Sequence, residues 1–487
     1  MKGLDRSLNF PISVVRALVG VFGEKLPNRR SLVNGGLNPV FNRLIVLAWD
    51  GHGGFRHAYS IGPSPFDYLI SFPHLMQSRG RISPSIMRRM SSLEEEVTPP
   101  RSMESAPTPT ATRRLVLARG GALTRFSGLG GAHHALLNHH QKGRFAGFDL
   151  LDVLEYPEQR SAFGKVRHRW SKQPKRVRSY CQQHLGPNDV LHITDQEQAH
   201  LAPPRSSLRP KVVITVHDLF HLFPFEQRVV LTDGENAMGE SLIEVGEHRP
   251  GRVRRRDLNK LREGLSRADL LVCDSTFTRD VCRREFPGVE AVAVPLGLDC
   301  DAYASSGVPQ KNPKFSMLFI GSSDPRKRLD FLFDLLHTCD EGLRQHSVLH
   351  VVGDQSQTAH ALAKSIDMEI MVHPRLDDQA LMLLRQEADV LLFPSAAEGY
   401  GYPPIESMAS GCPVLCSDLP AHNELMPEGA CLPAGDFRGW REALSGNFHA
   451  WETTTAKVPD ERLMEHARQF SADVFVQNMT AAYNALW

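Results

Sequence analysis

From residue 113 onward, the sequence alternates short apolar runs with longer stretches of helical character, and this alternation limits the fold more than any other feature. A first series of apolar runs lies at 114–123, 189–194, 211–219, 268–275 and 290–299, and a second at 315–323, 347–354, 368–374, 388–395 and 412–418. Strands of nearly continuous Val, Ile and Leu between helices are typical of parallel sheets that are buried on both faces. The sequence therefore predicts an α/β fold with two such domains in tandem.

The composition changes on either side of these two series. Residues 1–112 contain one short apolar run, 44–49, which fits a strand, among turn-rich stretches, and 98–114 is rich in Pro, Ser and Thr. We interpret 1–112 as an irregular, partly disordered N-terminal extension. The two domains then span 113–300 and 301–470, and a helical stretch follows at 471–487. In open α/β sheets, ligands bind beyond the carboxyl ends of the strands, so we expect one ligand site in the cleft between the domains.

Charge and cysteine content argue against several classes of protein. The net charge of +1 does not indicate a polyanionic partner such as nucleic acid. The eight cysteines include no C-x-x-C pair, so we expect buried thiols in a reducing compartment. No run reaches the roughly 18 apolar residues that span a bilayer, and Arg16 interrupts the N-terminal apolar run. We expect a cytoplasmic protein.

The stretch EGYGYPPIE, from Glu398 to Glu406, predicts a ligand site. It follows an apolar run, and Pro403 and Pro404 fit the first turn of a helix that would contain Glu406. Glycine lets backbone N–H groups approach a ligand closely, and a helix N-terminus favours anionic oxygens. Carboxylates accept hydrogen bonds from the hydroxyls of a sugar or a ribose. Two carboxylates this far apart suit two parts of one elongated ligand.

A basic pair, Arg326 and Lys327, lies where the sequence predicts the start of the helix 324–339. Cations at a helix N-terminus oppose the helix dipole unless an anion binds there. The pair therefore indicates an anion site. We expect the neighbouring Arg328 to face solvent.

Glu398-x(7)-Glu406, followed by MASGCPVLCSD, resembles the signature of the retaining GT-B glycosyltransferases of family 4. The stretch FIGSSDPRKRLDFLFDLL (319–336) is similar to the phosphate-binding stretch of that family. Three further segments resemble family patterns in the same order: VVITVHDLFHLFP (212–224), CDSTFTRDVC (273–282) and VAVPLGLD (292–299). The resemblance covers about 113–487. It implies two Rossmann-like domains facing a central cleft, with the acceptor bound by 113–300, the donor by 301–470, and the helix 471–487 packed back on the N-terminal domain.

The resemblance also implies roles for individual residues. The implied catalytic residues are His217 near the reacting sugar carbon, Glu398 at the donor sugar, and Arg326 and Lys327 at the diphosphate leaving group. The implied donor-binding residues are Glu406 at the ribose hydroxyls, Gly399, Tyr400 and Gly401 through their backbone, and Gly130 and Gly131 in a loop over the phosphates. Fixed cations aimed at a leaving diphosphate lower the barrier. Members of the family usually need no metal, so we expect neither a metal site nor a cofactor.

The implied function is transfer of a mannose- or glucose-like hexose from a nucleotide diphosphate sugar to a glycan or lipid-linked acceptor in surface polysaccharide biosynthesis, with retention of configuration. Two alternatives stay open: a catalytically silent homologue that acts as a binding subunit, and a nucleotide-sugar epimerase of the same fold. A P-loop nucleotidase is excluded, because the sequence has no G-x-x-x-x-G-K-[ST].

Three other features allow both an ordinary and a functional interpretation. The histidines at 133, 134, 139 and 140 have no metal-binding spacing, so we expect a solvent-exposed helix face. The Asp299-Cys300-Asp301 triplet begins the linker between the domains, and we do not expect it to bind a metal. The basic stretches 165–178 and 249–262 are interpreted as solvated helix faces, with peripheral contact to an anionic membrane as the alternative. No nucleic-acid motif accompanies them.

Overall fold

The computed structural model of this 487-residue chain describes residues 44–49, 55–60, 112–121, 128–156, 161–304, 311–354 and 356–487. The chain divides into two units, Met1–Ala106 and Pro107–Trp487. In the first unit, strand β1 (Leu44–Trp49), predicted from the apolar run, pairs antiparallel with β2 (Phe55–Ser60). The rest of the predicted irregular extension lies outside the described residues, apart from Thr112.

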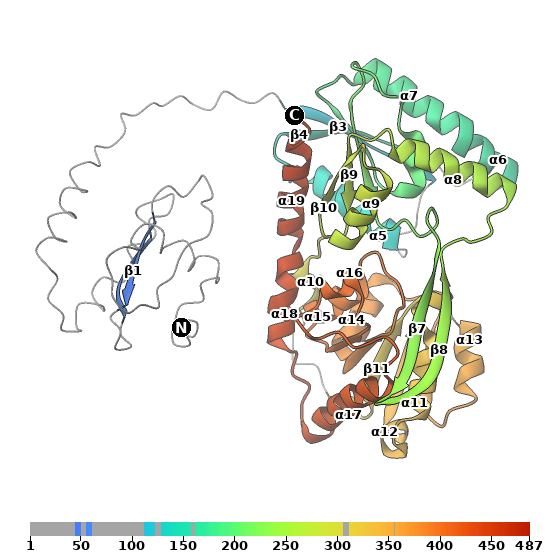
Figure 1. Cartoon of the computed structure of the whole chain (residues 1–487), viewed down its shortest axis with the longest axis vertical. Coiled ribbons are helices and arrows are strands. Elements are labelled where there is room, and N and C mark those ends of the chain that lie inside the picture. Colours follow the sequence, from blue (N-terminus) through green and yellow to red (C-terminus); the bar gives the residue numbers. More distant parts are fainter. Residues whose placement is uncertain are drawn as a thin grey trace, which may run out of the picture. The chain divides into compact units, whose positions relative to one another are not determined.

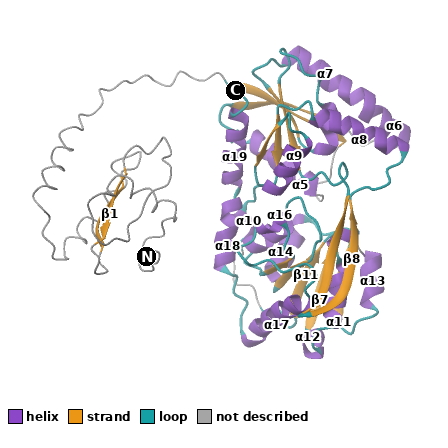
Figure 2. Ribbon diagram, in the orientation of Figure 1, coloured by secondary structure: helices purple, strands orange, loops and turns teal. Residues whose placement is uncertain are grey.

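The N-terminal half of the second unit (112–299) contains a six-stranded parallel sheet in the order β10-β9-β6-β5-β3-β4. Figures 1 and 2 show helices packed around this sheet. The strands are β3 (Arg113–Gly121), β4 (Phe148–Tyr156), β5 (Val190–Ile193), β6 (Lys211–Val216), β9 (Leu270–Cys273) and β10 (Glu290–Ala293). The α-helices are α5 (Gly128–Gln141), α6 (Ala162–Arg167), α7 (Gln173–His184), α8 (Arg252–Leu265) and α9 (Thr276–Glu285). Strands β5 and β9 are buried along their whole length, as their continuous apolar sequence predicts.

The C-terminal half (300–470) contains a five-stranded parallel sheet in the order β13-β12-β11-β14-β15. Its strands are β11 (Phe315–Ile320), β12 (Ser347–Val352), β13 (Glu369–His373), β14 (Val390–Phe393) and β15 (Val414–Cys416). Its helices are α10 (Cys300–Tyr303), α11 (Leu329–His337), α12 (Glu341–Gln345), α13 (Ser356–Ala363), α14 (Asp378–Glu387), α15 (Tyr402–Ala409), α16 (Pro420–Asn423), α17 (Phe437–Thr453) and α18 (Glu461–Ala467). The two parallel sheets confirm the predicted fold class. Among the described residues, no helix has the length and apolar character needed to cross a bilayer.

An antiparallel hairpin, formed by β7 (Phe225–Asp233) and β8 (Asn236–Val245), was not predicted. The hairpin leaves the N-terminal half and lies along the C-terminal half (Figure 1). There the Thr232 N–H donates to the Gly435 carbonyl at 2.9 Å, and Arg441 pairs with Asp233 at 2.8 Å. The two strands are joined by Gly234 and Glu235, and a glycine in a two-residue loop, here with φ of 64°, is a sequence signal for a hairpin.

The predicted exposed histidine face is wrong, because three of its four histidines are buried. Helix α19 (Ala472–Asn484) packs over them, and its Tyr483 hydroxyl lies 3.2 Å from His140 Nε2 and 2.7 Å from Nδ1 of His192 on β5. His133 Nδ1 lies 2.9 Å from the Thr194 hydroxyl. These histidines therefore belong to the polar core that joins the last helix to the first sheet.

Burial lowers the pKa of His133, His140 and His192 to about 3 each. In the unfolded chain a histidine titrates near 6.5, so below about pH 6.5 the unfolded state binds protons that the folded state excludes. The stability that these neutral histidines contribute is complete above pH 6.5 and is lost as the pH falls toward about 3.

We predict that the free energy of unfolding, measured by urea titration, falls between about pH 7 and pH 5 by about 2 kcal/mol for each of these histidines. His140→Gln, which keeps a side-chain polar group and removes one titration, should reduce this loss by about 2 kcal/mol. The exposed His360→Gln is the matched control and should leave the loss unchanged. An equal loss in the His140 variant and the wild type would contradict this account.

Candidate functional site

The two loops that the sequence singled out meet at the carboxyl ends of adjacent strands. Strand β11 leads to the short 3₁₀ helix Pro325–Lys327, and β14, its neighbour in the sheet, leads to the loop 394–401. The Ala396 N–H donates to the Arg326 carbonyl at 2.7 Å, which fastens one loop to the other. The structure thus brings Arg326 and Lys327 to Glu398.

The Glu398 carboxylate is buried between these two cations. Arg326 Nη1 lies 2.8 Å from Oε2, and Lys327 Nζ lies 2.5 Å from Oε1. Burial alone would raise the pKa of Glu398, but the Lys327 ammonium and the Arg326 guanidinium lower it well below its usual range. The carboxylate therefore stays ionised and fixes the position of both cations. Arg326 has a second carboxylate partner, the more exposed Asp324, at 2.9 Å.

Arg328 is buried, which corrects the prediction that it faces solvent. Its guanidinium donates to the carbonyls of Ala434 at 2.5 Å and Pro394 at 3.4 Å, and lies 4.1 Å from the ring centroid of Phe331. It also breaks the predicted helix 324–339, because its backbone is left-handed, with φ of 55°. The side chain contacts residues 66 and 106 positions away, which local sequence cannot reveal.

Glu406 lies in helix α15, after prolines in its first turn, as predicted. Its carboxylate already has two partners. The Tyr303 hydroxyl donates to Oε1 at 2.9 Å, and Arg385 of α14 pairs with Oε2. Tyr303 is the last residue of α10, in the segment that connects the two halves. Its hydrogen bond to Glu406 therefore links α15 to that connecting segment.

The Gly399–Gly401 segment is attached to the N-terminal half. The hydroxyls of Ser275 and Thr278 donate to the Gly399 carbonyl at 2.6 and 3.2 Å, and the Tyr400 hydroxyl donates to the Leu296 carbonyl at 2.8 Å. A Cβ on Gly399 would lie 2.0 Å from the His217 carbonyl oxygen, so only glycine fits between the halves.

Nearby, Glu424 extends from the C-terminal half to the first turn of α9. Its carboxylate accepts from the backbone N–H groups of Thr276 and Phe277 at 2.6 and 2.8 Å. Such N–H groups have no partner within the helix, so a carboxylate from the facing half satisfies them.

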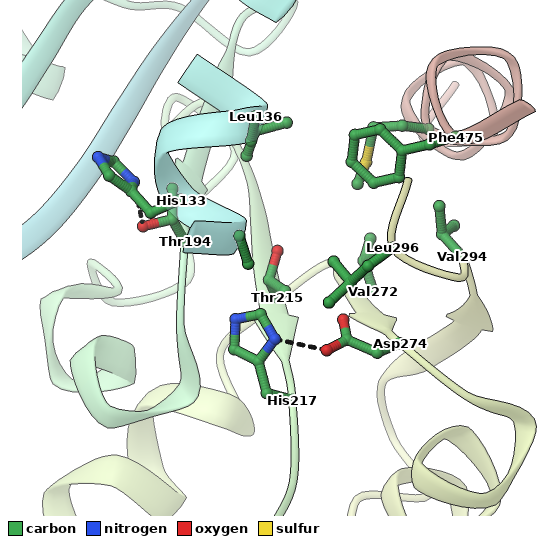
Figure 3. Close-up of a pocket in the computed structure, with 12 residues that line it drawn as sticks. His133, Leu136, Thr194, Thr215, His217, Val272, Asp274, Val294, Leu296 and Phe475 are labelled. Carbon is green, nitrogen blue, oxygen red and sulfur yellow. Dashed lines mark hydrogen bonds and ion pairs between the residues drawn. The ribbon is translucent and has the colours of Figure 1, made fainter. Parts of the chain in front are cut away.

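His217 follows β6 and forms a buried pair with Asp274, which follows β9 (Figure 3). His217 Nδ1 lies 2.5 Å from Asp274 Oδ2, and its Nε2 has no hydrogen-bond partner among the described residues. Burial alone would lower the pKa of His217, but the Asp274 carboxylate outweighs it and raises this pKa to about 9. His217 is therefore an imidazolium at neutral pH, with one N–H able to bind an oxygen atom.

Gly130 and Gly131 lie in the first turn of α5, which corrects the prediction that they form a loop. Ala132 and Leu136 of the same helix are buried in the core, and this packing extends the helix back through the glycines despite their low helix propensity. Ala132 and His133 line the same small cavity as His217, so this helix start lies on the same side of the sheet (Figure 3).

Several residues of the site were missed by the sequence analysis: Asp274, Ser275, Thr278, Tyr303, Arg385 and Glu424. Asp274, Ser275 and Thr278 lie within 273–282, a stretch whose resemblance to the family indicates no individual residue. Tyr303 and Arg385 carried no local signal, since each is defined by its contact with Glu406. In the described ranges, no three His, Cys, Asp or Glu side chains are grouped so that they could hold a metal ion.

Comparison with known proteins agrees with this geometry. Residues 305–434 match the family described as "Glycosyl transferases group 1". The chain is 30% identical over 175 residues to the phosphatidyl-myo-inositol mannosyltransferase of Mycobacterium leprae, covering 34% of this chain and 47% of that protein. It is 27% identical over 146 residues to the O-antigen chain mannosyltransferase RfbU of Salmonella typhimurium, covering 29% and 40%. The matches thus span about half or less of the length of these relatives.

Solved structures share the fold over a larger part of the chain. Anabaena HepE in complex with UDP and glucose aligns with a TM-score of 0.54 at 15% identity, covering 77% of this chain and 100% of that one. The sucrose-phosphate synthase of Thermosynechococcus elongatus aligns with a TM-score of 0.56 at 15% identity, covering 77% and 99%. These structures have the GT-B fold, with two parallel sheets. The chain thus has the GT-B fold and, over residues 305–434, which hold Glu398 and Glu406, the sequence of a group 1 glycosyltransferase domain.

Proposed function

We propose that this protein transfers a mannose- or glucose-like hexose from a nucleotide diphosphate sugar to a glycan or lipid-linked acceptor of a surface polysaccharide, with retention of configuration. One observation carries the proposal. A buried carboxylate, Glu398, holds two cations at the carboxyl ends of β11 and β14, where parallel sheets bind ligands.

The cation pair suits a diphosphate leaving group. When the bond to the sugar breaks, negative charge grows on the phosphate oxygens, and positive groups already in place stabilise that charge without reorganising. Arg326 and Lys327 are held in place by Glu398, and Arg326 is also held by Asp324 at 2.9 Å. No residue must move to create this field.

His217 would act on the sugar side. Its Nε2 has no partner among the described residues, and the raised pKa keeps a proton on the ring at neutral pH. An Nε2–H of this kind donates a hydrogen bond to a sugar oxygen. Asp274 orients the ring through Nδ1 and would thereby fix the direction of that bond.

Glu406 would bind the ribose by exchanging one hydrogen-bond donor, the Tyr303 hydroxyl, for a ribose hydroxyl. A ribose hydroxyl can donate to Oε1 in place of the Tyr303 hydroxyl, while Arg385 keeps Oε2. Donor binding would then release Tyr303 from its hydrogen bond.

The relatives support the choice of sugar and acceptor. Two of those matched are mannosyltransferases, one acting on a phosphatidyl-inositol lipid and one on the O-antigen chain. HepE, a fold neighbour, binds UDP-glucose. The alternative, a silent binding subunit, would be favoured by loss of Glu398 or of the basic pair. All three are present and in contact.

The first test is thermal stabilisation of the purified chain by UDP, GDP, ADP and TDP, with and without a chelator of divalent metals. We expect one nucleotide to stabilise the protein in both conditions. Glu406→Ala should weaken its binding about 100-fold, because charged hydrogen bonds are lost. Tyr303→Phe should tighten it about three- to tenfold, because the competing hydroxyl is removed.

The control for this test is Glu428→Ala, which changes an exposed glutamate of the same half and should bind as the wild type does. If a folded sample responds to none of the four nucleotides, the silent binding subunit becomes the better account.

A second prediction concerns the leaving group. Lys327→Met keeps the length of the side chain and leaves Glu398 paired with Arg326, so the fold should persist. Turnover, followed as release of nucleoside diphosphate from the selected donor, should fall by about 10²- to 10³-fold with a smaller change in KM. Lys364→Met, at an exposed position, is the control. An unchanged kcat would remove Lys327 from the proposed mechanism.

A third prediction concerns pH. The wild-type rate should decline as the pH rises through about 9, where the imidazolium of His217 loses its proton. Asp274→Asn removes the charge that raises this pKa, so the alkaline limb of the kcat profile should move to lower pH by about two units or more. An unchanged alkaline limb would mean that His217 does not act as a cation.

A further inference from the structure

One long helical segment, 162–184, has an apolar stripe whose N-terminal part is not covered by the rest of the fold. Helix α6, a π-helical turn (His168–Lys172) and α7 follow one another without a break from Ala162 to His184. Along the stripe, Val177 is buried and Trp170 is half-buried, whereas Val166 is 41% exposed and Phe163 is 76% exposed. The segment therefore ends in an uncovered apolar tip.

Cations surround this tip. Residues 161–184 contain seven Lys and Arg and no Asp or Glu. Six of these cations have exposed side chains and form no ion pair with a described residue: Lys165, Arg167, Lys172, Lys175, Arg176 and Arg178. An uncompensated cluster of this size repels itself, which disfavours it unless an anionic surface is bound.

Helix α8 adds a second basic segment beside the first, and the two meet at Trp170. Trp170 Nε1 donates to Asp257 Oδ1 of α8 at 2.8 Å, and Lys260 Nζ lies 4.8 Å from the centroid of the indole ring. Arg256 lies 5.5 Å from the same centroid. The two basic stretches, separate in the sequence, therefore form one surface.

The acids near this junction are used within the fold. Arg169 pairs with Asp257 at 2.8 Å, and Arg254 pairs with Glu197 and Glu247 at 3.0 and 2.9 Å. Arg249, Arg252 and Arg255 of the second stretch are exposed and form no ion pair with a described residue. Val253, at the start of α8, is 61% exposed. The surface thus combines uncompensated cations with exposed apolar side chains at the starts of two helices.

We propose that α6, α7 and the start of α8 form a surface that binds an anionic membrane. The exposed lysines and arginines would bind lipid headgroups, and Phe163, Val166 and Val253 would enter the interfacial region. Exposed cations with apolar side chains at their margin suit a bilayer surface. A nucleic acid would match the charge, and Phe163 could stack on a base, but the aliphatic Val166 and Val253 could not.

The biological role of this surface rests on the proposed function, since a lipid-linked acceptor would lie in such a membrane. Membrane binding itself does not depend on that function. The surface belongs to the N-terminal half, to which the resemblance assigns the acceptor. Its test needs neither donor nor acceptor, so failure of one proposal is distinguishable from failure of the other.

The experiment is binding of the full chain to phosphatidylcholine vesicles with and without phosphatidylglycerol, at low and high salt. We expect binding only when the anionic lipid is present, and weaker binding at high salt. Each lysine or arginine near such a surface contributes about fivefold in affinity, so the triple variant Lys172→Ser, Lys175→Ser, Arg178→Ser should bind about 100-fold more weakly. Phe163→Ser with Val166→Ser should weaken binding about tenfold or more and leave its salt dependence in place.

Matched controls change equal numbers of exposed residues elsewhere. The triple variant Lys142→Ser, Lys364→Ser, Arg462→Ser and the double variant Leu208→Ser, Val458→Ser should bind as the wild type does. The proposal is overturned if the wild type does not bind anionic vesicles, or if the control variants lose binding equally. It is also overturned if the Phe163 and Val166 variant instead converts an oligomer to a monomer, or if the wild type prefers a single-stranded oligonucleotide to the vesicles.

Discussion

The ionised carboxylate of Glu398 is the interaction on which the rest of the site depends. It is buried, and an isolated buried charge is so unfavourable that the fold must supply partners for it. Arg326 and Lys327, in the 3₁₀ helix that follows the neighbouring strand β11, are these partners, at 2.8 and 2.5 Å. Each member of the cluster would be costly to bury alone. Together they hold two adjacent loops in one arrangement, and the left-handed Arg328 secures the same turn by bonding to two carbonyls.

The same loop that carries Glu398 also joins the two halves. Gly399 follows directly, accepts two hydroxyl hydrogen bonds from the start of α9, and lies too close to the His217 backbone for any side chain. The position of the cation cluster relative to His217 is therefore set by backbone contact. A displacement of one half would move His217 away from the charges with which we propose it acts.

Much of this could be predicted from the sequence, because parallel strands obey a simple geometry. Loops that follow the strands of one parallel sheet lie at the same edge, so the sequence predicts that the carboxylate after β14 and the cations after β11 face one ligand site. The pairing of β11 with β14, which brings them into contact, is seen only in the structure. The partners of Glu406 could not be predicted, since Tyr303 and Arg385 reach it from 103 and 21 residues away through side-chain conformations. The buried histidines escaped notice for a related reason. They are covered by α19, whose Tyr483 is separated from His140 by 343 positions in the sequence. The spacing of the histidines gives no sign that a distant helix buries them.

The hairpin β7–β8 has a consequence for how the protein can open. It starts in one half and is hydrogen-bonded and ion-paired to the other through Thr232 and Asp233. Two domains joined only by a linker and a terminal helix can rotate apart about that hinge. Here the hairpin bridges the two halves, so wide opening requires that its contacts with the C-terminal half break. Entry and exit of ligands would then depend on how readily a two-stranded ribbon detaches, so the rate of the proposed transfer would be set in part far from the atoms that react.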